Sequence, residues 1–209
     1  MARISVCFVR PMVWVDRRVQ GGALVALAWH LSIELGTSRR QSRAAAKAAD
    51  VDERVVDTAT SRWFEVAAAT ALIGATAASL TCRRGVIRHQ RSSVAAGLAL
   101  LAASGALSTS ARRHLGRFHR DSLTVHEDHQ LVDTGPYRRV RHPLYTATIG
   151  VFVGLGATLG HWLSVAFAVL PTGALIHRIR VEDAMLDDAL GASYVTYRRR
   201  TSRLVPGLW

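Results

Sequence analysis

Residues 135–145, Gly-Pro-Tyr-Arg-Arg-Val-Arg-His-Pro-Leu-Tyr, combine a helix start with cationic side chains. Pro143 disfavours the α conformation at the residue before it and is itself favoured at the first position of a helix. We therefore expect a helix to begin at Pro143, with His142 near its cap. Its first turn would offer backbone N–H groups and the positive end of the helix dipole beside Arg141 and His142. This suits an anionic group such as a carboxylate; a basic turn that anchors to lipid head groups is an equal alternative.

A second candidate pair is Arg178 with Glu182, which lie one helical turn apart and are followed by Asp183. An arginine can hold a carboxylate through two parallel hydrogen bonds, and a glutamate can bind an amine or a ribose hydroxyl. The alternative is a surface ion pair at this spacing, which stabilises a helix by only about 0.2–0.5 kcal/mol.

Apolar blocks must position these residues. Four of them occur, at residues 19–36, 63–80, 93–110 and 146–176, and the last has no Asp, Glu, Lys or Arg. A membrane span needs roughly 20 apolar residues, so the last block is too long for one helix and suits a hairpin of two. Gly160, His161 and Trp162 are expected to form its turn. The count is then five spans, with Trp63 and Trp162 at span ends, where indole rings favour the membrane interface.

The composition agrees with a membrane protein. Among 209 residues 49% are apolar, and the mean hydropathy is +0.15 despite 27 basic and 15 acidic residues. The basic residues, all Arg except Lys47, lie between the apolar blocks and are not interleaved with aromatic side chains as in nucleic-acid-binding proteins. We therefore expect membrane lipids as partners and no nucleic acid.

The basic residues also predict an orientation. Segments 37–62 and 111–145 and the chain after the last span hold nineteen basic residues, against eight on the opposite side. Segments 37–62 and 111–145 and the chain after the last span are therefore expected in the cytoplasm. Residues 178–200 have helical periodicity with acidic residues first and Arg198 to Arg200 last, which matches a helix dipole. They predict a cytoplasmic helix continuing from, or packed beneath, the last span.

Two further motifs are interpreted structurally. The glycines from Gly150 to Gly160 do not follow a strand, so they are expected to allow close helix packing and not to bind a nucleotide. His30 and Glu34 share a helix face without a third ligand nearby, and we expect a polar pair inside the bundle or at the head groups. No metal site is predicted.

Two blocks, separated by the hairpin, resemble a known family. The pattern Gly-Pro-Tyr-x-x-x-Arg-His-Pro-x-Tyr is followed by Arg178…Glu182-Asp183-x-x-Leu186…Gly191-x-x-Tyr194-x-x-Tyr197…Arg203-Leu-Val-Pro-Gly-Leu-Trp209. Together they resemble the isoprenylcysteine carboxyl methyltransferases and their phospholipid methyltransferase relatives. The resemblance runs from about Thr124 to Trp209. It divides the chain into N-terminal spans and basic loops (residues 1–110) and a catalytic core (residues 111–209).

The resemblance implies an all-α, multi-pass transmembrane bundle that binds S-adenosyl-L-methionine at its cytoplasmic face. Arg178 matches an arginine near the substrate carboxylate, and is the implied catalytic residue. At Asp183 many relatives have a second glutamate. The implied cofactor-binding residues are His129, Gln130, Leu131, Val132, Tyr137, His142, Pro143, Leu144, Tyr145 and Glu182.

The function implied is therefore methyl transfer to a lipophilic or membrane-borne acceptor, foremost a carboxylate. Amine or thiol acceptors stay open at this point. An NADPH-dependent reductase of a sterol-like lipid and a non-catalytic membrane protein with the same scaffold also stay open. The ending of the chain argues against the reductase, whose relatives lack it.

Overall fold

The computed structural model describes residues 54–57, 59–82, 85–116, 123–125 and 131–208. The predictions for the first span, for His30 with Glu34, and for His129 and Gln130 lie outside the described residues. In the described ranges the chain forms β1 (Arg54–Asp57), α2 (Ala59–Thr81), α3 (Gln90–Leu115), β2 (Leu123–Val125), the 3-10 helix η2 (Gly135–Arg138), α4 (Pro143–Thr158), α5 (Trp162–Ala166), α6 (Val169–Leu190) and α7 (Ala192–Arg200).

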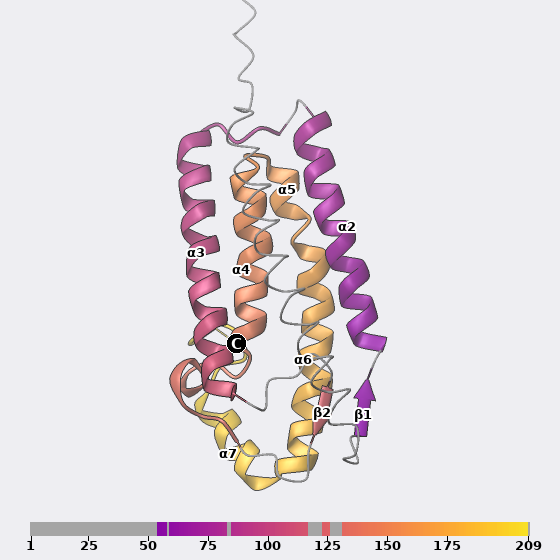
Figure 1. Ribbon diagram of the computed structural model, residues 1–209, viewed down its shortest axis with the longest axis vertical. Coiled ribbons are helices and arrows are strands. Elements are labelled where there is room, and N and C mark those ends of the chain that lie inside the picture. The colour runs from indigo at the N-terminus through magenta and orange to yellow at the C-terminus, as the bar shows by residue number, and fades with distance from the viewer. Residues whose placement is uncertain (1–53, 58, 83–84, 117–122, 126–130, 209) are drawn as a thin grey trace, which may run out of the picture.

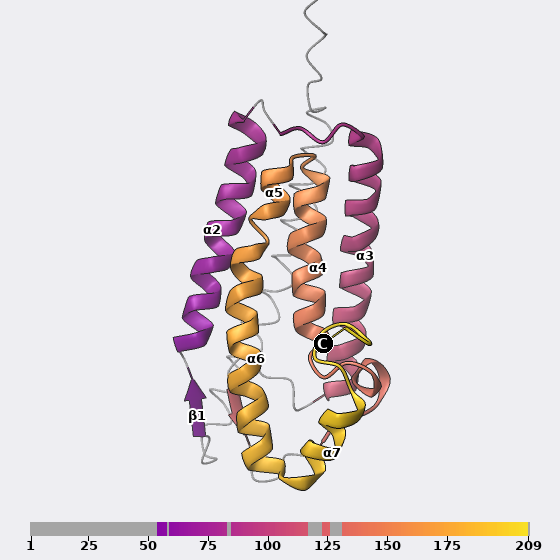
Figure 2. The same ribbon diagram turned by 180° about the vertical axis from the view of Figure 1, so that it is seen from behind.

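The long helices run side by side as a bundle (Figures 1 and 2). α3 packs along α4, while α2 packs on α5 and α6. The expected all-α bundle is confirmed. β1 and β2 add a short antiparallel pair at one end, with Arg54 opposite Val125 and an irregularity between Val55 and Asp57.

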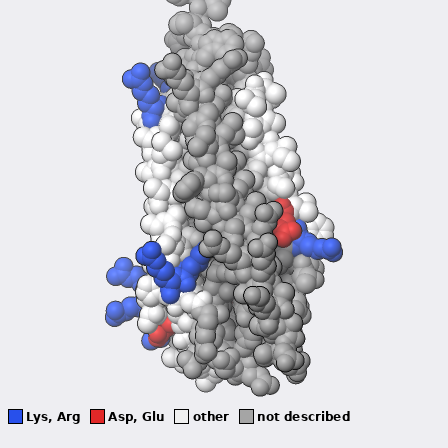
Figure 3. Space-filling view, viewed as in Figure 1, with Lys and Arg blue, Asp and Glu red and all other residues white. Residues whose placement is uncertain are grey.

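Three helical segments are long and apolar enough to cross a membrane, namely Arg62–Thr81, Gln90–Leu115 and Trp162–Leu190, and α4 is a shorter apolar helix. In α3, residues 92–111 carry no charge and lie between Arg91 and Arg112. At 1.5 Å rise per residue this stretch spans about 30 Å, the thickness of a bilayer's hydrocarbon core. In Figure 3 the basic side chains on the α3 side gather near the two ends, with an uncharged surface between them. Within the described part of the chain, the predicted blocks are thus confirmed as helices of a membrane protein.

The hairpin turn lies where it was expected. α4 ends at Thr158, Gly160 has a φ of +68°, and α5 begins at Trp162. His161 is fully buried and its side chain accepts a hydrogen bond from the Leu163 amide. The link between α2 and α3 fastens this turn, since Ile87 N donates to Gly160 O at 2.9 Å and Trp162 N to Gly85 O at 3.0 Å.

The second arm of the hairpin is two helices, not the single one expected. α5 ends at Ala166 and α6 begins at Val169. Pro171 has no N–H to donate to the carbonyl of Phe167, four residues earlier. Instead, Leu170 N donates to Phe167 O at 3.3 Å. This bond closes a turn over three residues instead of four and marks the break. Pro171 was the signal in the sequence for this interruption.

Small residues bring α3 and α4 close together, as predicted. A Cβ at Gly154 would lie 3.0 Å from the carbonyl oxygen of Gly97, and one at Gly97 would lie 2.6 Å from that of Gly154. One turn away, a Cβ at Gly150 would lie 2.2 Å from Ser104 Oγ. Ser93 Oγ also donates to Ala157 O at 2.8 Å. The glycines therefore set the spacing of two helices.

The helix predicted over residues 178–200 continues from the last apolar run, because α6 starts at Val169. The prediction of a single unbroken helix is wrong, because α6 ends at Leu190 and Gly191, with a φ of +54°, separates it from α7. The acidic residues consequently occupy the second half of α6, where the helix dipole disfavours them. Ion pairs compensate: Asp187 pairs with Arg198 of α7, and Asp183 pairs with His142 and Arg203.

Two glycines of α3 test this packing. Gly97→Ala places a methyl group against α4 and should lower the free energy of unfolding by about 1–3 kcal/mol through overpacking. Gly105 has nothing within 4 Å of an added Cβ. Gly105→Ala should be neutral or stabilising by up to about 1 kcal/mol, because alanine favours the helix. Thermal unfolding in detergent measures both; equal effects of the two substitutions would contradict the packing account.

Candidate active site at one end of the bundle

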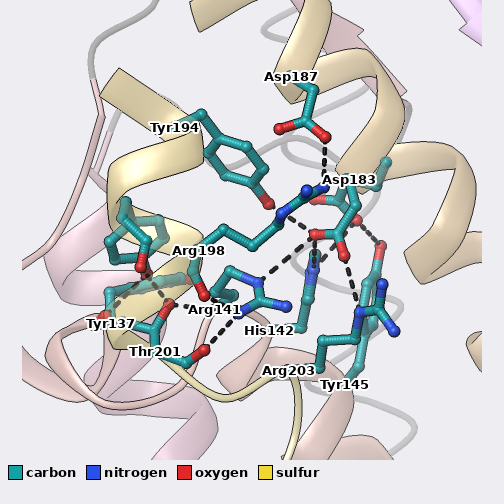
Figure 4. Close-up of polar contacts among 12 residues, drawn as sticks. Tyr137, Arg141, His142, Tyr145, Asp183, Asp187, Tyr194, Arg198, Thr201 and Arg203 are labelled. Carbon is teal, nitrogen blue, oxygen red and sulfur yellow. Dashed lines mark hydrogen bonds and ion pairs between the residues drawn. The ribbon is translucent and has the colours of Figure 1, made fainter. Parts of the chain in front are cut away.

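The start of α4, the second half of α6, α7 and the chain that follows α7 meet at one end of the bundle (Figures 2 and 4). η2 begins at Gly135, which has a φ of +57°, and turns the chain toward α4. α4 begins at Pro143 with His142 at its cap, as predicted. His142 is only 4% exposed, so it lies inside the protein and is not a surface anchor for lipid head groups.

Arg178, Tyr145 and Glu182 form a chain of hydrogen bonds. Arg178 Nε donates to the Tyr145 hydroxyl at 2.9 Å, and that hydroxyl donates to Glu182 Oε2 at 2.7 Å. Arg178 is 7% exposed, so it is not half of a surface ion pair. The Glu182 side chain is 27% exposed. The side chain is thus held by Tyr145 and still partly exposed.

Asp183 joins four partners from three segments (Figure 4). Its Oδ1 accepts hydrogen bonds from His142 Nε2 at 2.9 Å and from the Tyr194 hydroxyl at 2.6 Å. Its Oδ2 accepts one from Arg203 Nε at 2.9 Å. Arg141 Nε lies 3.7 Å from Oδ1. Asp183 is 3% exposed, and a buried carboxylate requires this number of donors.

The segment of residues 201–204, called here the closing segment, runs beside the start of α4. Arg141 N donates to Ser202 O at 2.8 Å, His142 N to Arg203 O at 3.0 Å, and Ser202 N to Arg139 O at 3.0 Å. Thr146 Oγ1 also donates to Leu204 O at 2.7 Å. The backbone before α4 is therefore paired with the backbone after α7.

Arg141 ties α7 to the same place. Its Nη1 donates to the carbonyl oxygen of Arg198 at 3.0 Å and to that of Thr201. These carbonyls lie at the end of α7, where intrahelical donors run out and a cation is favoured. The sequence pattern contained Arg141, Tyr194 and Arg203 without indicating these roles, because each depends on contacts between distant segments.

Three tyrosines of the site are held in their neutral form. Burial, with a smaller contribution from the Glu182 charge, raises the pKa of Tyr137 well above its ordinary value. Burial and the hydrogen bond to Asp183 do the same to the pKa of Tyr194. Burial raises the pKa of Tyr197 to about 12; its hydroxyl donates to Tyr137 O at 2.7 Å.

Of the predicted site residues, the structure brings together His142, Tyr145, Arg178 and Glu182. Pro143 and Leu144 form the first turn of α4 beside them. Leu131 and Val132 are half-buried ahead of η2. Tyr137 is buried in η2, where its carbonyl, rather than its ring, makes the hydrogen bond to Tyr197. Among the described residues, no three His, Cys, Asp or Glu side chains group as a metal site would require.

Comparison with known proteins agrees with this arrangement. Residues 92–193 match the family described as phospholipid methyltransferase. The resemblance to this family of membrane methyltransferases is confirmed. The chain is 34% identical over 89 residues to protein-S-isoprenylcysteine O-methyltransferase B of Arabidopsis thaliana, which covers 42% of this chain and 45% of that protein.

A second relative carries a different name. The nickel-cobalt-cadmium resistance protein NccN of Alcaligenes xylosoxydans xylosoxydans is 39% identical over 84 residues, which cover 38% of this chain and 37% of that protein. The chain thus spans less than half the length of these curated relatives. A solved structure, the eukaryotic intramembrane Ras methyltransferase isoprenylcysteine carboxyl methyltransferase, superposes with a TM-score of 0.67 at 19% identity, covering 96% of this chain and 70% of that one. It has the same fold.

The raised tyrosine pKa values predict loss of stability in alkali. An unfolded tyrosine ionises near pH 10, whereas Tyr197 in the folded protein ionises near 12. The stabilisation is therefore complete below pH 10 and is lost as the pH rises toward 12, by about 1.4 kcal/mol per pH unit for each such group. Thermal unfolding between pH 8 and 12 measures this loss. Tyr197→Phe should make the alkaline decline shallower, and an unchanged slope would contradict the assignment.

Proposed function

We propose that this protein is an integral-membrane methyltransferase that uses S-adenosyl-L-methionine to methylate a lipophilic or lipid-borne acceptor, foremost a carboxylate. The observation that carries the proposal is the hydrogen-bonded chain Arg178–Tyr145–Glu182 next to the start of α4, where two blocks of the family pattern meet. The family match and the shared fold support it.

The residues at this end of the bundle fit such a cofactor. S-adenosyl-L-methionine has an amine, a carboxylate and ribose hydroxyls, and supplies an electrophilic methyl group when bound. The carboxylate of Glu182, on a partly exposed side chain, suits the amine or a ribose hydroxyl. The first turn of α4 offers amides that have no intrahelical acceptor, which suits the cofactor carboxylate. The residues proposed to line the rest of the site are His129, Gln130, Leu131, Val132, Tyr137, His142, Pro143, Leu144 and Tyr145.

Arg178 is proposed to hold the acceptor. It lies in α6 after the apolar run and shares the Tyr145 hydroxyl with Glu182, so a group bound at Arg178 lies close to a group bound at Glu182. A carboxylate acceptor is already ionised at neutral pH and needs no general base. Catalysis by this chain would then rest on orienting the two reactants and on excluding water.

The first test is cofactor binding. His142→Ala and Glu182→Ala should each weaken the binding of S-adenosyl-L-methionine in calorimetry by about tenfold or more, the usual cost of losing a hydrogen bond to a charged group. Asp188→Ala, an exposed acid on the same helix, is the matched control and should bind normally. Wild-type affinity in both site variants, with the proteins folded, would place the cofactor elsewhere.

A second test separates the acceptor from the cofactor. Arg178→Lys keeps the charge but loses the planar, two-pronged geometry. Turnover should fall by about tenfold or more while cofactor affinity stays near wild type. Arg180→Lys, at an exposed position on α6, should change neither. If cofactor affinity collapses in Arg178→Lys, the division of roles between Arg178 and Glu182 is wrong; if nothing changes, Arg178 has only a structural role beside Tyr145.

The proposed orientation puts the site in the cytoplasm. The turn between α4 and α5 and the chain after α7 lie at opposite ends of the bundle (Figure 1). The excess of basic residues on the side of the site favours the cytoplasm there. Reporter fusions after Gly160 and after Leu208 should therefore report opposite sides, with Leu208 cytoplasmic. The same side for both would contradict the hairpin, and the reverse assignment would contradict the orientation.

A further inference from the structure

The two adjacent acids of α6 have different surroundings. Glu182 is partly exposed and accepts from Tyr145, while Asp183 is buried and bound entirely by protein groups. Given the proposed function, Glu182 faces the ligand. Asp183 can therefore influence the ligand only through its protein partners, His142, Tyr194 and Arg203.

The hydrogen bonds of Asp183 determine a proton position. A carboxylate with donors from Tyr194 and Arg203 is ionised and can only accept, so the third partner, His142 Nε2, must carry a hydrogen. The other ring nitrogen, Nδ1, then lies on the side of Glu182, 3.7 Å from Oε2. Asp183 thus fixes the ring orientation of a residue at the start of α4 and keeps a hydrogen on its Nε2.

The same carboxylate anchors the closing segment. Arg203, bound to Oδ2, belongs to the segment whose carbonyls accept from the backbone amides of Arg141 and His142. Tyr194, bound to Oδ1, belongs to α7. One buried side chain therefore holds the imidazole of His142 from one side and the backbone partner of His142 from the other.

We propose that Asp183 is a positioning residue, which holds the imidazole of His142 with a hydrogen on Nε2 and closes residues 201–204 over the start of α4. It acts through His142 and Arg203 and does not touch the ligand. This inference rests on the proposed function for what the positioned residues bind, but its geometry can be tested without it.

Asp183→Asn is the decisive variant because it preserves shape. The side-chain amide of the new asparagine must direct its NH2 group either at Arg203 or at His142 and Tyr194. The first choice places two hydrogen-bond donors face to face. The second choice requires His142 to accept at Nε2 and to carry its hydrogen on Nδ1. Arg203→Gln, at a position with a 27% exposed side chain, removes the ion pair between Asp183 and the closing segment and leaves the Asp183 carboxylate and its donor His142 in place. Asp188→Asn, on the exposed side of α6, is the matched control.

Three measurements on the full-length protein in detergent distinguish the outcomes. Nitrogen-15 spectra of histidine-labelled protein, with His142 assigned by His142→Asn, should show the Nε2–H form in wild type and the Nδ1–H form or a mixture in Asp183→Asn. Hydrogen exchange should accelerate in peptides covering 139–146 and 201–208 in Asp183→Asn and Arg203→Gln, while residues 92–111 stay protected. Binding of S-adenosyl-L-methionine should weaken about tenfold in Asp183→Asn.

The results separate this inference from the proposed function. An unchanged histidine spectrum and unchanged exchange in Asp183→Asn overturn the positioning role, as does a loss of thermal stability with normal cofactor affinity in the folded protein. If wild type does not bind the cofactor at all, the proposed function fails, while the spectra and the exchange still decide the role of Asp183. If Asp183→Asn does not fold, Arg203→Gln decides. Faster hydrogen exchange confined to peptides 139–146 and 201–208 supports the anchoring of the closing segment by Asp183, and exchange at the wild-type rate overturns it.

Discussion

The hydrogen bond between His142 and Asp183 joins positions 41 residues apart and ties the start of α4 to the second half of α6. The other contacts of the site lie around this junction. Tyr145, one turn further along α4, reaches Arg178 and Glu182 because the two helices are held together there. The hairpin between them ends in a turn that is itself fastened to the link between α2 and α3.

Burying this many charges requires compensation. A carboxylate taken out of water costs several kcal/mol unless donors replace the lost hydration. Asp183 receives three hydrogen bonds, two from groups that can carry positive charge, and Arg141 lies nearby. The cluster therefore favours one arrangement of α4, α6, α7 and the closing segment, because separating any of them would leave a buried charge without its partners. A rigid site of this kind suits a reaction that depends on orientation.

Local signals made much of the fold predictable from the sequence. Pro143 restricts its neighbour sterically, so the start of α4 could be placed to the residue. The uncharged block of residues 146–176 was too long for one span, and Gly160 allowed a turn in its middle. The interior of the last segment was harder to predict: the charge distribution of residues 178–200 matched one unbroken helix, whereas Gly191 divides the segment between α6 and α7. The roles of Arg141, Asp183 and Arg203 appear only when the four segments are assembled, and the β1–β2 pair had no signal in the periodicity.

The most direct measurement of the central claim is transfer of a radiolabelled methyl group from S-adenosyl-L-methionine to the lipid or protein fraction of a membrane extract, by purified wild type and by Glu182→Gln. The account predicts label in a lipophilic product, released by mild base if the acceptor is a carboxylate, and a loss of about tenfold or more in the variant. Bound cofactor without any transfer would indicate a scaffold that is not catalytic. Equal transfer by wild type and Glu182→Gln would contradict a site built on the Arg178–Tyr145–Glu182 chain.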